Sequence, residues 1–271
     1  MFRIHCKNAI SEEGLQSLLP NFTLTERQEE ADGILVRSAD MHEEKLGEAT
    51  LAVARAGAGV NNIPLERFAE EGVVVFNTPG ANANSVKELV ICEMLLAARN
   101  VIPAVHWVAS HKDAPDIVKE AEKGKKQFVG TEICGKKLGV IGLGAIGAEV
   151  ANAAVALGME VYGYDPYLSV NGAWRISKEA RHATSLEELC RQCDYITIHV
   201  PLTEKNPGMI GEKEIAAMKE GVVFLNFSRD KLVDERAMEA ALTSGKVRLY
   251  VTDFANPLSV KLENAIVTPH L

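Results

Sequence analysis

Three glycines in one short stretch have the spacing that a bound dinucleotide requires. Gly142, Gly144 and Gly147 form an uninterrupted G-x-G-x-x-G. The first glycine allows a tight turn, the second lets a pyrophosphate lie against bare backbone, and the third lets a helix pack closely on a strand. The free N–H groups at the start of that helix, at Ala145 and Ile146, then face the anion.

The residues around this motif predict the elements that position it. An apolar run at 138–141 indicates a buried strand, and the small apolar residues of 148–157 indicate a helix that Gly158 ends. A second strand at 160–164 ends at Asp165. A carboxylate there can accept the ribose hydroxyls of an adenosine and would repel a 2′-phosphate. The order of strand, turn, helix, strand and acid predicts an NAD site.

Composition and charge narrow the class of protein. The chain has 271 residues, 47% of them apolar and 24% charged, which suits two globular domains. The net charge of −8 argues against a nucleic-acid surface. The N-terminus has no secretory h-region, and the longest apolar stretch, 89–98, contains Glu93 and is too short to span a bilayer. We expect a cytoplasmic protein with no membrane partner.

The five cysteines have no framework spacing. Cys190 and Cys193 form a C-x-x-C near the end of an expected helix, with no second pair or histidine close in sequence. We interpret them as packing thiols and expect no metal site.

Residues 1–80 alternate strand-like and helical patterns, which predicts a parallel sheet with crossover helices. Strand ends in this part carry Arg37 and Arg55, the latter followed by a loop that contains Ala58 and Gly59. Two arginines and free loop N–H groups can bind an anion, although solvated arginines and a simple turn are the alternative. The expected strands are 2–6, 33–38, 51–57 and 73–80, and the expected helices are 12–19, 42–49 and 64–72.

Residues 84–100 predict an amphipathic helix, with Asn84 or Ser85 as N-cap and Glu88 placed for a capping box. The segment that follows, to about Gly135, is expected to be irregular and charged, notably at 111–126, as a surface excursion or a subunit contact. Strand and helix patterns then alternate to the end of the chain. The expected strands are 195–202, 221–228, 247–254 and 265–271, and the expected helices are 184–193, 210–219 and 234–245.

Phrases along nearly the whole chain, among them ARAGAGVNN, FNTPGANANSVKEL, KLGVIGLGAIG, CDYITIHVPLT, NFSRDKLVDERAMEAAL and TPHL, resemble the D-isomer-specific 2-hydroxyacid dehydrogenases. The resemblance implies an α/β fold of two Rossmann-like, doubly wound parallel-sheet domains with an inter-domain cleft. Residues 1–80 would form a flavodoxin-like substrate-binding domain that lacks its C-terminal return segment, and residues 81–271 the NAD-binding Rossmann domain. A homo-oligomer is also implied, namely a homodimer joined through the cofactor domains.

The resemblance also implies a role for individual residues. Arg229 would bind the substrate carboxylate, His270 would exchange the proton of the C2 hydroxyl, and Asp253 would hold the nicotinamide carboxamide. Val200, Pro201 and Phe227 would line the cofactor site. The backbone of Ala58 and Gly59 would contact the substrate carboxylate, while Arg37, Arg55 and Lys87 would meet a phosphate.

Departures from the family pattern bear on the catalytic group. Asn256 stands where the family places a glutamate that pairs with the histidine, so we expect an amide there to orient the imidazole without stabilising its charge. Asp230 replaces a glycine and Asn61 an aspartate. The sequence ends one residue after His270, where relatives continue.

These expectations lead to one function and two alternatives. The first is NAD-dependent interconversion of a phosphorylated 2-hydroxy acid, 3-phospho-D-glycerate, with 3-phosphohydroxypyruvate. The second is a glyoxylate or hydroxypyruvate reductase, which needs no phosphate-binding cations. The third is a protein that binds NAD(H) as a sensor without turnover.

Overall fold

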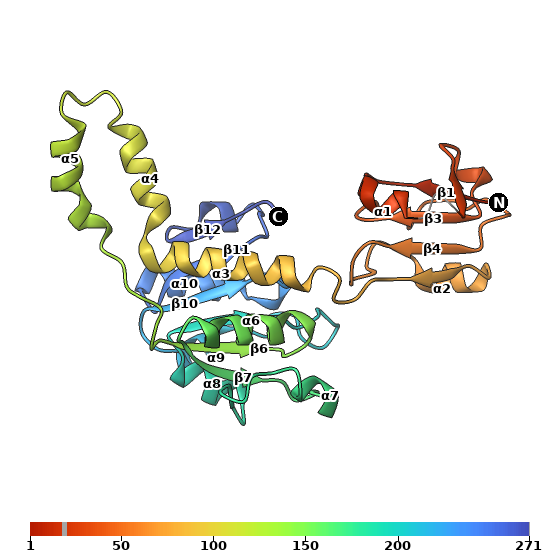
Figure 1. The fold of residues 1–271 in the computed structure, drawn as a ribbon. Coiled ribbons are helices and arrows are strands. Elements are labelled where there is room, and N and C mark those ends of the chain that lie inside the picture. The colour runs from red at the N-terminus through yellow and green to blue at the C-terminus, as the bar shows by residue number, and fades with distance from the viewer. Residues whose placement is uncertain (18–20, 271) are drawn as a thin grey trace. The chain divides into compact units, whose positions relative to one another are not determined.

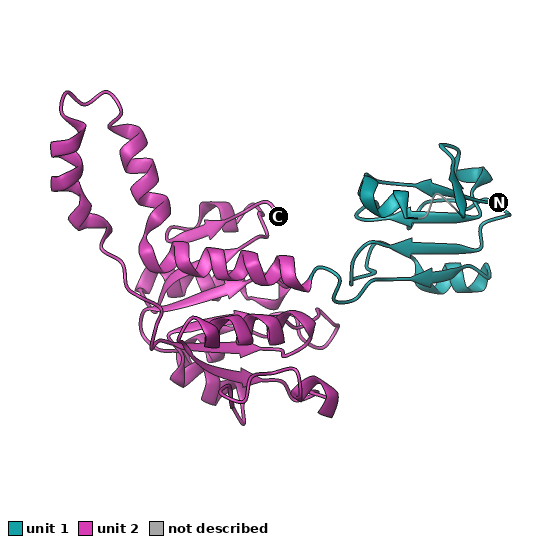
Figure 2. Cartoon of the chain, in the orientation of Figure 1, with its two compact units in different colours: residues 1–82 teal, residues 83–271 magenta. Residues whose placement is uncertain are grey.

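Parallel sheets organise both halves of the chain (Figure 1). The computed structural model describes residues 1–17 and 21–270, and the chain divides into two compact units, residues 1–82 and 83–271 (Figure 2). Every pair of neighbouring strands is parallel in the described residues. The predicted α/β class is therefore confirmed, with each βα step returning to its own sheet.

The first unit is built on a five-stranded sheet of order β2-β1-β3-β4-β5, an arrangement typical of flavodoxin-like domains. The short strand β2 was not predicted. Residues 18 and 19 of the expected helix 12–19 lie outside the described residues. The elements are β1 (Phe2–Cys6), α1 (Glu12–Gln16), β2 (Phe22–Leu24), η1 (Gln28–Glu30), β3 (Gly33–Val36), β4 (Ala52–Arg55), α2 (Leu65–Glu70) and β5 (Val74–Phe76).

The two faces of this sheet differ in what covers them. Ile34, Val36 and Val53 point into a core completed by Phe68 of α2 and by Met41. The opposite face carries residues that are in register across the strands and are apolar or glycine: Phe22, Leu24, Phe2, Ile4, Cys6, Gly33, Leu35, Ala52, Ala54, Val74 and Phe76. Phe2, Val74 and Phe76 are more than half exposed there.

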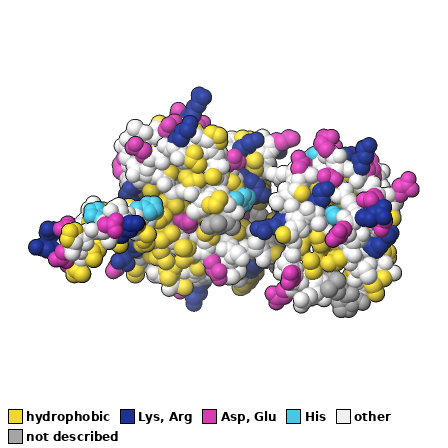
Figure 3. All heavy atoms as spheres, turned by 90° about the horizontal axis from the view of Figure 1, so that it is seen from above, with side chains coloured by type: hydrophobic (Ala, Val, Ile, Leu, Met, Phe, Trp, Pro, Cys, Tyr) yellow, Lys and Arg dark blue, Asp and Glu magenta, His cyan; other side chains and the backbone are white. Residues whose placement is uncertain are grey.

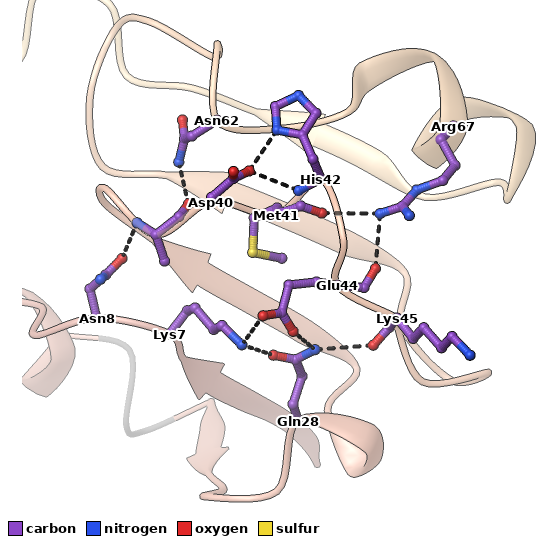
Figure 4. Close-up of polar contacts among 11 residues, drawn as sticks. Lys7, Asn8, Gln28, Asp40, Met41, His42, Glu44, Lys45, Asn62 and Arg67 are labelled. Atoms are coloured by element: carbon purple, nitrogen blue, oxygen red, sulfur yellow. Dashed lines mark hydrogen bonds and ion pairs between the residues drawn. The ribbon is translucent and has the colours of Figure 1, made fainter.

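The segment 42–49, predicted as a helix, forms turns instead (Figure 4). Side chains from other segments donate to its carbonyl oxygens, which backbone N–H groups would do in a helix. Arg67 donates to the carbonyl oxygens of Met41 and Glu44, at 3.0 and 2.8 Å, and Gln28 donates to that of Lys45 at 3.1 Å. Lys7 also pairs with the Glu44 carboxylate at 2.8 Å. These long-range contacts override the local helical preference.

The second unit has a seven-stranded sheet of order β12-β11-β10-β9-β6-β7-β8. Strand β6 pairs with both β7 and β9, so the strand order reverses beside β6, where doubly wound sheets bind ligands. The two-residue strand β8 was not predicted. The strands are β6 (Lys137–Ile141), β7 (Glu160–Tyr164), β8 (Arg181–His182), β9 (Tyr195–Ile198), β10 (Val222–Asn226), β11 (Val247–Thr252) and β12 (Ala265–Val267).

Helices cover both faces of this sheet. Residues of α3 and α6 pack on one face, around Val90, Met94 and Val150, while α8, α9 and α10 pack on the other, around Leu189 and Met238. The helices are α3 (Ala83–Arg99), α4 (Val101–Ser110), α5 (Ile117–Gly124), α6 (Ala145–Ala156), α7 (Val170–Ala173), α8 (Leu186–Gln192), α9 (Glu212–Ala217) and α10 (Glu235–Ser244), with the short turns η2 (Lys125–Phe128), η3 (Asp230–Leu232) and η4 (Ser259–Lys261).

Helix α3 begins at Ala83, so the predicted N-cap at Asn84 or Ser85 is wrong. Asn84 lies within the first turn and donates to Glu88 at 2.8 Å, one helical turn further on. The helix ends where Asn100 adopts a left-handed conformation, with a φ of 51°. Its side chain donates to the carbonyl oxygen of Val129 at 3.1 Å, which fixes the bend into α4.

Helices α4 and α5 form a hairpin in the segment that was expected to be irregular (Figure 1). Neither helix has a buried residue. The two arms meet at Trp107 of α4, whose ring lies edge-on to that of Phe128 in η2, with centroids 6.0 Å apart. Asp116 caps α5 by accepting from the N–H of Lys119 at 3.0 Å. The expectation of irregular structure between residue 100 and about Gly135 was therefore wrong for the residues of α4 and α5.

In the described part of the chain, no single helix has the length and apolar character needed to cross a membrane. Helices α3 and α4 have the necessary length and apolar character only when taken together, and the chain bends by 64° between them.

Candidate functional site

The glycine turn after β6 has the conformation that its sequence predicts. Gly142 has a φ of 87°, and a Cβ there would lie 2.7 Å from the carbonyl oxygen of His199. A Cβ on Gly147 would lie 1.9 Å from the carbonyl oxygen of Gly142, so only glycine allows this helix to approach the strand. Both positions thus require glycine for steric reasons.

Gly144 differs from these two glycines because it faces open space. A Cβ at Gly144 would meet nothing within 4 Å, and no side chain caps the N-terminus of α6 at this residue. The N–H groups of Ala145 and Ile146 therefore remain available at a helix end with partial positive charge. These features fit the pyrophosphate of a dinucleotide.

Asp165 follows β7 and supports the turn directly. Its Oδ2 accepts from the N–H of Leu143 at 2.9 Å, and its Oδ1 accepts from the N–H of Tyr167 at 2.9 Å. Each carboxylate oxygen keeps a lone pair for a ribose hydroxyl. A pocket of about 370 Å³ opens beside Asp165 and Gly144, and Arg175 contributes to its lining.

Val200 and Pro201 lie after β9, on the other side of the point where the strand order reverses. The Cγ1 atom of Val200 would lie 2.7 Å from a Cβ on Gly142, so this residue borders the glycine turn. The carbonyl oxygen of Val200 accepts from Ser228 at 2.8 Å, which ties the end of β9 to the end of β10. Phe227, predicted to contact the cofactor, is 6% exposed and belongs to the core that α3 and α6 cover.

Asn226, the last residue of β10, holds the turn that presents Arg229. Its fully buried amide donates to the carbonyl oxygen of Arg229 at 2.9 Å and accepts from the N–H of Ser228 at 3.1 Å. Thr252 Oγ1 donates to the carbonyl oxygen of Asn226 at 3.0 Å. The position of the guanidinium therefore depends on a buried amide whose role the sequence did not reveal.

Arg229, Asp253 and His270 come together at the carboxyl ends of β10, β11 and β12. The N–H of His270 donates to the carbonyl oxygen of Asp253 at 2.9 Å, and the imidazole lies edge-on to Phe254 at 5.2 Å. Burial raises the pKa of Asp253, while the charges of His270 and then Arg229 oppose that rise. The side chains of Arg229 and His270 are thus both within electrostatic reach of Asp253.

Asn256 is engaged away from the imidazole. Its Nδ2 donates to the carboxylate of Glu235, and its Oδ1 accepts from the N–H groups of Leu258 and Ser259, at 2.9 and 2.8 Å. No hydrogen bond joins Asn256 to His270 in the described residues. The structure does not bring these two predicted catalytic residues together.

In the first unit, Arg55 holds its own loop. Its guanidinium donates to the carbonyl oxygens of Arg37, at 3.0 Å, and of Gly59. The adjoining loop is braced by Thr78, which accepts from the N–H of Gly57 at 2.8 Å, and by Asn77, which donates to the carbonyl oxygen of Ala58 at 2.7 Å.

The end of β3 is organised by Asn8. The side-chain oxygen of Asn8 accepts from three consecutive N–H groups, those of Arg37, Ser38 and Ala39, at 3.0, 3.1 and 3.0 Å. Arg37 itself is exposed. Lys87 lies in the second unit, on α3, where it donates to Asn84. Convergence of Arg37, Arg55 and Lys87 on one phosphate stays a prediction.

The cysteine pair was interpreted correctly as packing thiols. Cys190 and Cys193 are fully buried, and burial raises the pKa of each thiol to about 12, so neither forms a reactive thiolate at neutral pH. Within the residues that the structure describes, no group of three or more His, Cys, Asp and Glu side chains is arranged to hold a metal ion.

Sequence reasoning missed Asn8, Asn226 and Glu235. Each acts through a hydrogen bond to a residue distant in sequence or to its own turn. The only local signal was a buried amide at the end of the apolar run VVFLN. A polar residue that ends such a run is expected to be hydrogen-bonded.

Known proteins resemble the chain along its whole length. It is 40% identical to D-3-phosphoglycerate dehydrogenase of Methanocaldococcus jannaschii, over 91% of this chain and 47% of that protein. It is 34% identical to hydroxypyruvate reductase of Thermotoga maritima, over 100% of this chain and 91% of that protein. The chain spans about half the length of the first of these relatives.

A solved structure agrees with both the fold and the cofactor. NAD+-bound 3-phosphoglycerate dehydrogenase of Entamoeba histolytica is 27% identical, with a TM-score of 0.78 over 99% of this chain and 86% of that one. Residues 91–271 match the family model described as "D-isomer specific 2-hydroxyacid dehydrogenase, NAD binding domain". The chain belongs to the D-isomer specific 2-hydroxyacid dehydrogenase family, and its second unit carries the family's NAD-binding domain.

Proposed function

We propose that the chain catalyses NAD-dependent interconversion of 3-phospho-D-glycerate and 3-phosphohydroxypyruvate. The observation that carries the proposal is the meeting of Arg229, Asp253 and His270 at the carboxyl ends of three adjacent strands, in the unit that holds the glycine turn. Several relatives named D-3-phosphoglycerate dehydrogenase match the chain at 34–40% identity. NAD, when bound, accepts or returns the hydride.

The protein's own residues bind and orient the substrate and move one proton. The Arg229 guanidinium stays charged and can grip the substrate carboxylate with two N–H groups, which fixes C2. The His270 imidazole takes the proton of the C2 hydroxyl in oxidation and returns it in reduction. Asp253 would hold the carboxamide of the nicotinamide and so fix which ring face accepts the hydride.

Hydroxypyruvate reductase is the second candidate, because the Thermotoga maritima relative of that name is matched over 91% of its length. A sensor that binds NAD(H) without turnover is the third, and it is supported by the engagement of Asn256 with Glu235 in place of His270. In all three cases we propose a homodimer joined through the cofactor-binding units.

Substrate choice depends on cations in the first unit. Arg37 is exposed and follows β3, whereas Arg55 already holds the loop around Gly59. Loss of a phosphate-binding guanidinium should cost about 1.5–3 kcal/mol, or roughly ten- to hundredfold in KM. We therefore expect Arg37→Ala to raise KM for phosphohydroxypyruvate by that factor and KM for hydroxypyruvate by less than about twofold.

NADH consumption with phosphohydroxypyruvate, hydroxypyruvate and glyoxylate tests whether the protein turns over a ketoacid and which ketoacid it prefers. The matched control is Arg27→Ala, which removes an exposed arginine of the same unit that pairs with Glu29 and Glu30. Equal effects of Arg37→Ala on both ketoacids would remove the phosphate assignment. NADH binding without turnover of any ketoacid would favour the sensor.

A further inference from the structure

Two buried carboxyl groups lie on elements that pack against each other, Glu93 on α3 and Asp253 directly after β11. Glu93 is 4% exposed and Asp253 is 5% exposed. Glu93 Oε2 and Asp253 Oδ1 are both buried atoms with no hydrogen-bond partner among the described residues. The negative charge of Asp253 also raises the pKa of Glu93, which places the two groups within electrostatic reach.

Two ionised carboxylates in this position would be costly. Each buried charge without a hydrogen-bond partner carries a desolvation penalty, and the two charges also repel each other. A proton on one group makes it a donor and the other an acceptor, which relieves both problems. Burial is the main cause that raises the pKa of either group.

The surrounding charges decide which group keeps the proton. Arg229 after β10 and His270 after β12 both favour the charged form of Asp253. Among the described residues, no cation lowers the pKa of Glu93 in this way. Helix α6, which also packs on α3, carries one acidic residue, Glu149, and it pairs with Arg175 at 3.8 Å. The proton therefore belongs on Glu93 and the charge on Asp253.

We propose that Glu93 is a positioning residue that shares one proton with Asp253, and that binding of the positively charged oxidised nicotinamide favours release of this proton to solvent. The inference rests on the proposed function, because it needs the nicotinamide to bind at Asp253. The reduced ring is neutral and exerts no such pull. Glu93 then links the preference for NAD+ or NADH to pH without touching the cofactor.

Affinity for the two cofactor forms tests the proton linkage. We expect the ratio of Kd for NAD+ to Kd for NADH to fall by about tenfold as pH rises through the titration of the pair, which lies above that of an ordinary carboxyl group. Glu93→Gln keeps a donor for Asp253 but has no proton to release. It should bind NADH like the wild type and show a ratio that does not change with pH.

Two further variants separate positioning from packing. Glu93→Leu fills the site without a donor and should weaken NADH binding at every pH by about tenfold, whereas Glu93→Gln should not. The matched control is Glu88→Gln, the same substitution at an exposed position of α3, which should leave the pH dependence unchanged. A wild-type ratio that is independent of pH, or a full pH dependence in Glu93→Gln, would overturn the proposal.

Carbon-13 NMR of the carboxyl groups tests the shared proton without cofactor. One glutamate signal should titrate above the others, disappear in Glu93→Gln, and titrate at lower pH in Asp253→Asn, because the neighbouring charge is then gone. Titration of Glu93 together with the exposed glutamates would contradict the shared proton. If the wild type bound neither cofactor form, the proposed function would fail, and this measurement would still decide whether the pair shares a proton.

Discussion

His199 follows β9 beside the glycine turn, yet the proposed chemistry does not use it. Its Nε2 lies 3.0 Å from Thr197 Oγ1, and its Nδ1 is buried with no partner among the described residues. Burial lowers the pKa of His199 to about 3. The native state therefore holds this imidazole neutral at a pH where the unfolded chain would protonate it.

The sign of the resulting pH dependence follows from linkage. Below the unfolded pKa of about 6.5 the unfolded state binds a proton that the folded state does not, so the free energy of unfolding falls as pH falls. We expect His199 to contribute a loss of about 1.4 kcal/mol per pH unit between about pH 6 and pH 4. Urea unfolding of the wild type and of His199→Asn at several pH values measures it.

The stability advantage of the wild type over His199→Asn, measured as free energy of unfolding, should shrink as pH falls. Only the wild type has an imidazole that stays unprotonated in the folded state and is protonated on unfolding. His182→Asn is the control, because His182 is exposed on β8 and should leave the slope unchanged. A constant difference over this pH range would show that His199 is protonated in the folded state.

The site residues that sequence predicted well are those whose chemistry is local. Gly142 and Gly147 follow from the spacing of one motif, and a positive φ or a close backbone approach explains each. Asn8 and Glu235 could not be found this way, because their partners lie about 20 to 30 residues away in sequence. Only the folded chain shows which carbonyl or N–H group such a side chain meets.

At the scale of elements, strands were easier to predict than exposed helices. Buried strands such as β9 and β10 are continuous apolar runs, which a parallel sheet requires. Helix α5 has no buried residue and depends on its Asp116 cap, and its short sequence, IVKEAEKG, is rich in charge and poor in apolar residues. At 42–49 the opposite happened: a helix was predicted and turns are found. Arg67 and Gln28 donate to carbonyl oxygens that would bind backbone N–H groups in a helix.

The hairpin of α4 and α5 leads to a prediction about assembly. Val105, Val108 and Val118 are 59%, 52% and 73% exposed, and hydrophobic side chains are also widespread on the face of the second unit in Figure 3. If the hairpin covers a second copy, each buried valine contributes about 1.5–3 kcal/mol. Val105→Asp and Val118→Asp should each weaken the dimer at least about tenfold in sedimentation experiments.

Val260→Asp is the matched control, because Val260 is 60% exposed on η4, outside the hairpin. It should leave the dimer intact. A dimer that dissociates only in the control variant, or in none of the three, would place the subunit contact elsewhere.

At the scale of the whole molecule, the two units have separate cores. The core around Phe68 contains only residues of 1–82, and the two cores of the second sheet contain only residues of 83–271. Gly142, Asp165, Asp253 and every other predicted cofactor residue lie in the second unit. The predicted substrate residues are divided between independently packed units: Arg37, Arg55, Ala58 and Gly59 lie in the first, and Lys87 and Arg229 in the second.

This division predicts that residues 83–271 alone will fold and bind NADH. Because the complete glycine turn, the Asp165 pocket and the Glu93–Asp253 pair remain, Kd for NADH should stay within about threefold of that of the full chain. Turnover of a ketoacid should be lost, since Arg37, Arg55 and the loop at Ala58 are removed. Calorimetry and fluorescence titration of the fragment measure folding and binding separately.

Gly144→Val in the same fragment supplies the control that ties binding to the turn. A Cβ added at Gly144 meets nothing within 4 Å, and a φ of −66° suits any residue, so the fragment should remain folded. The valine would occupy the space in front of the α6 N-terminus, where the pyrophosphate must approach, and should weaken NADH binding at least about tenfold. A fragment that folds but binds no NADH, or a Gly144→Val variant that binds it unchanged, would show that the dinucleotide does not lie on this turn.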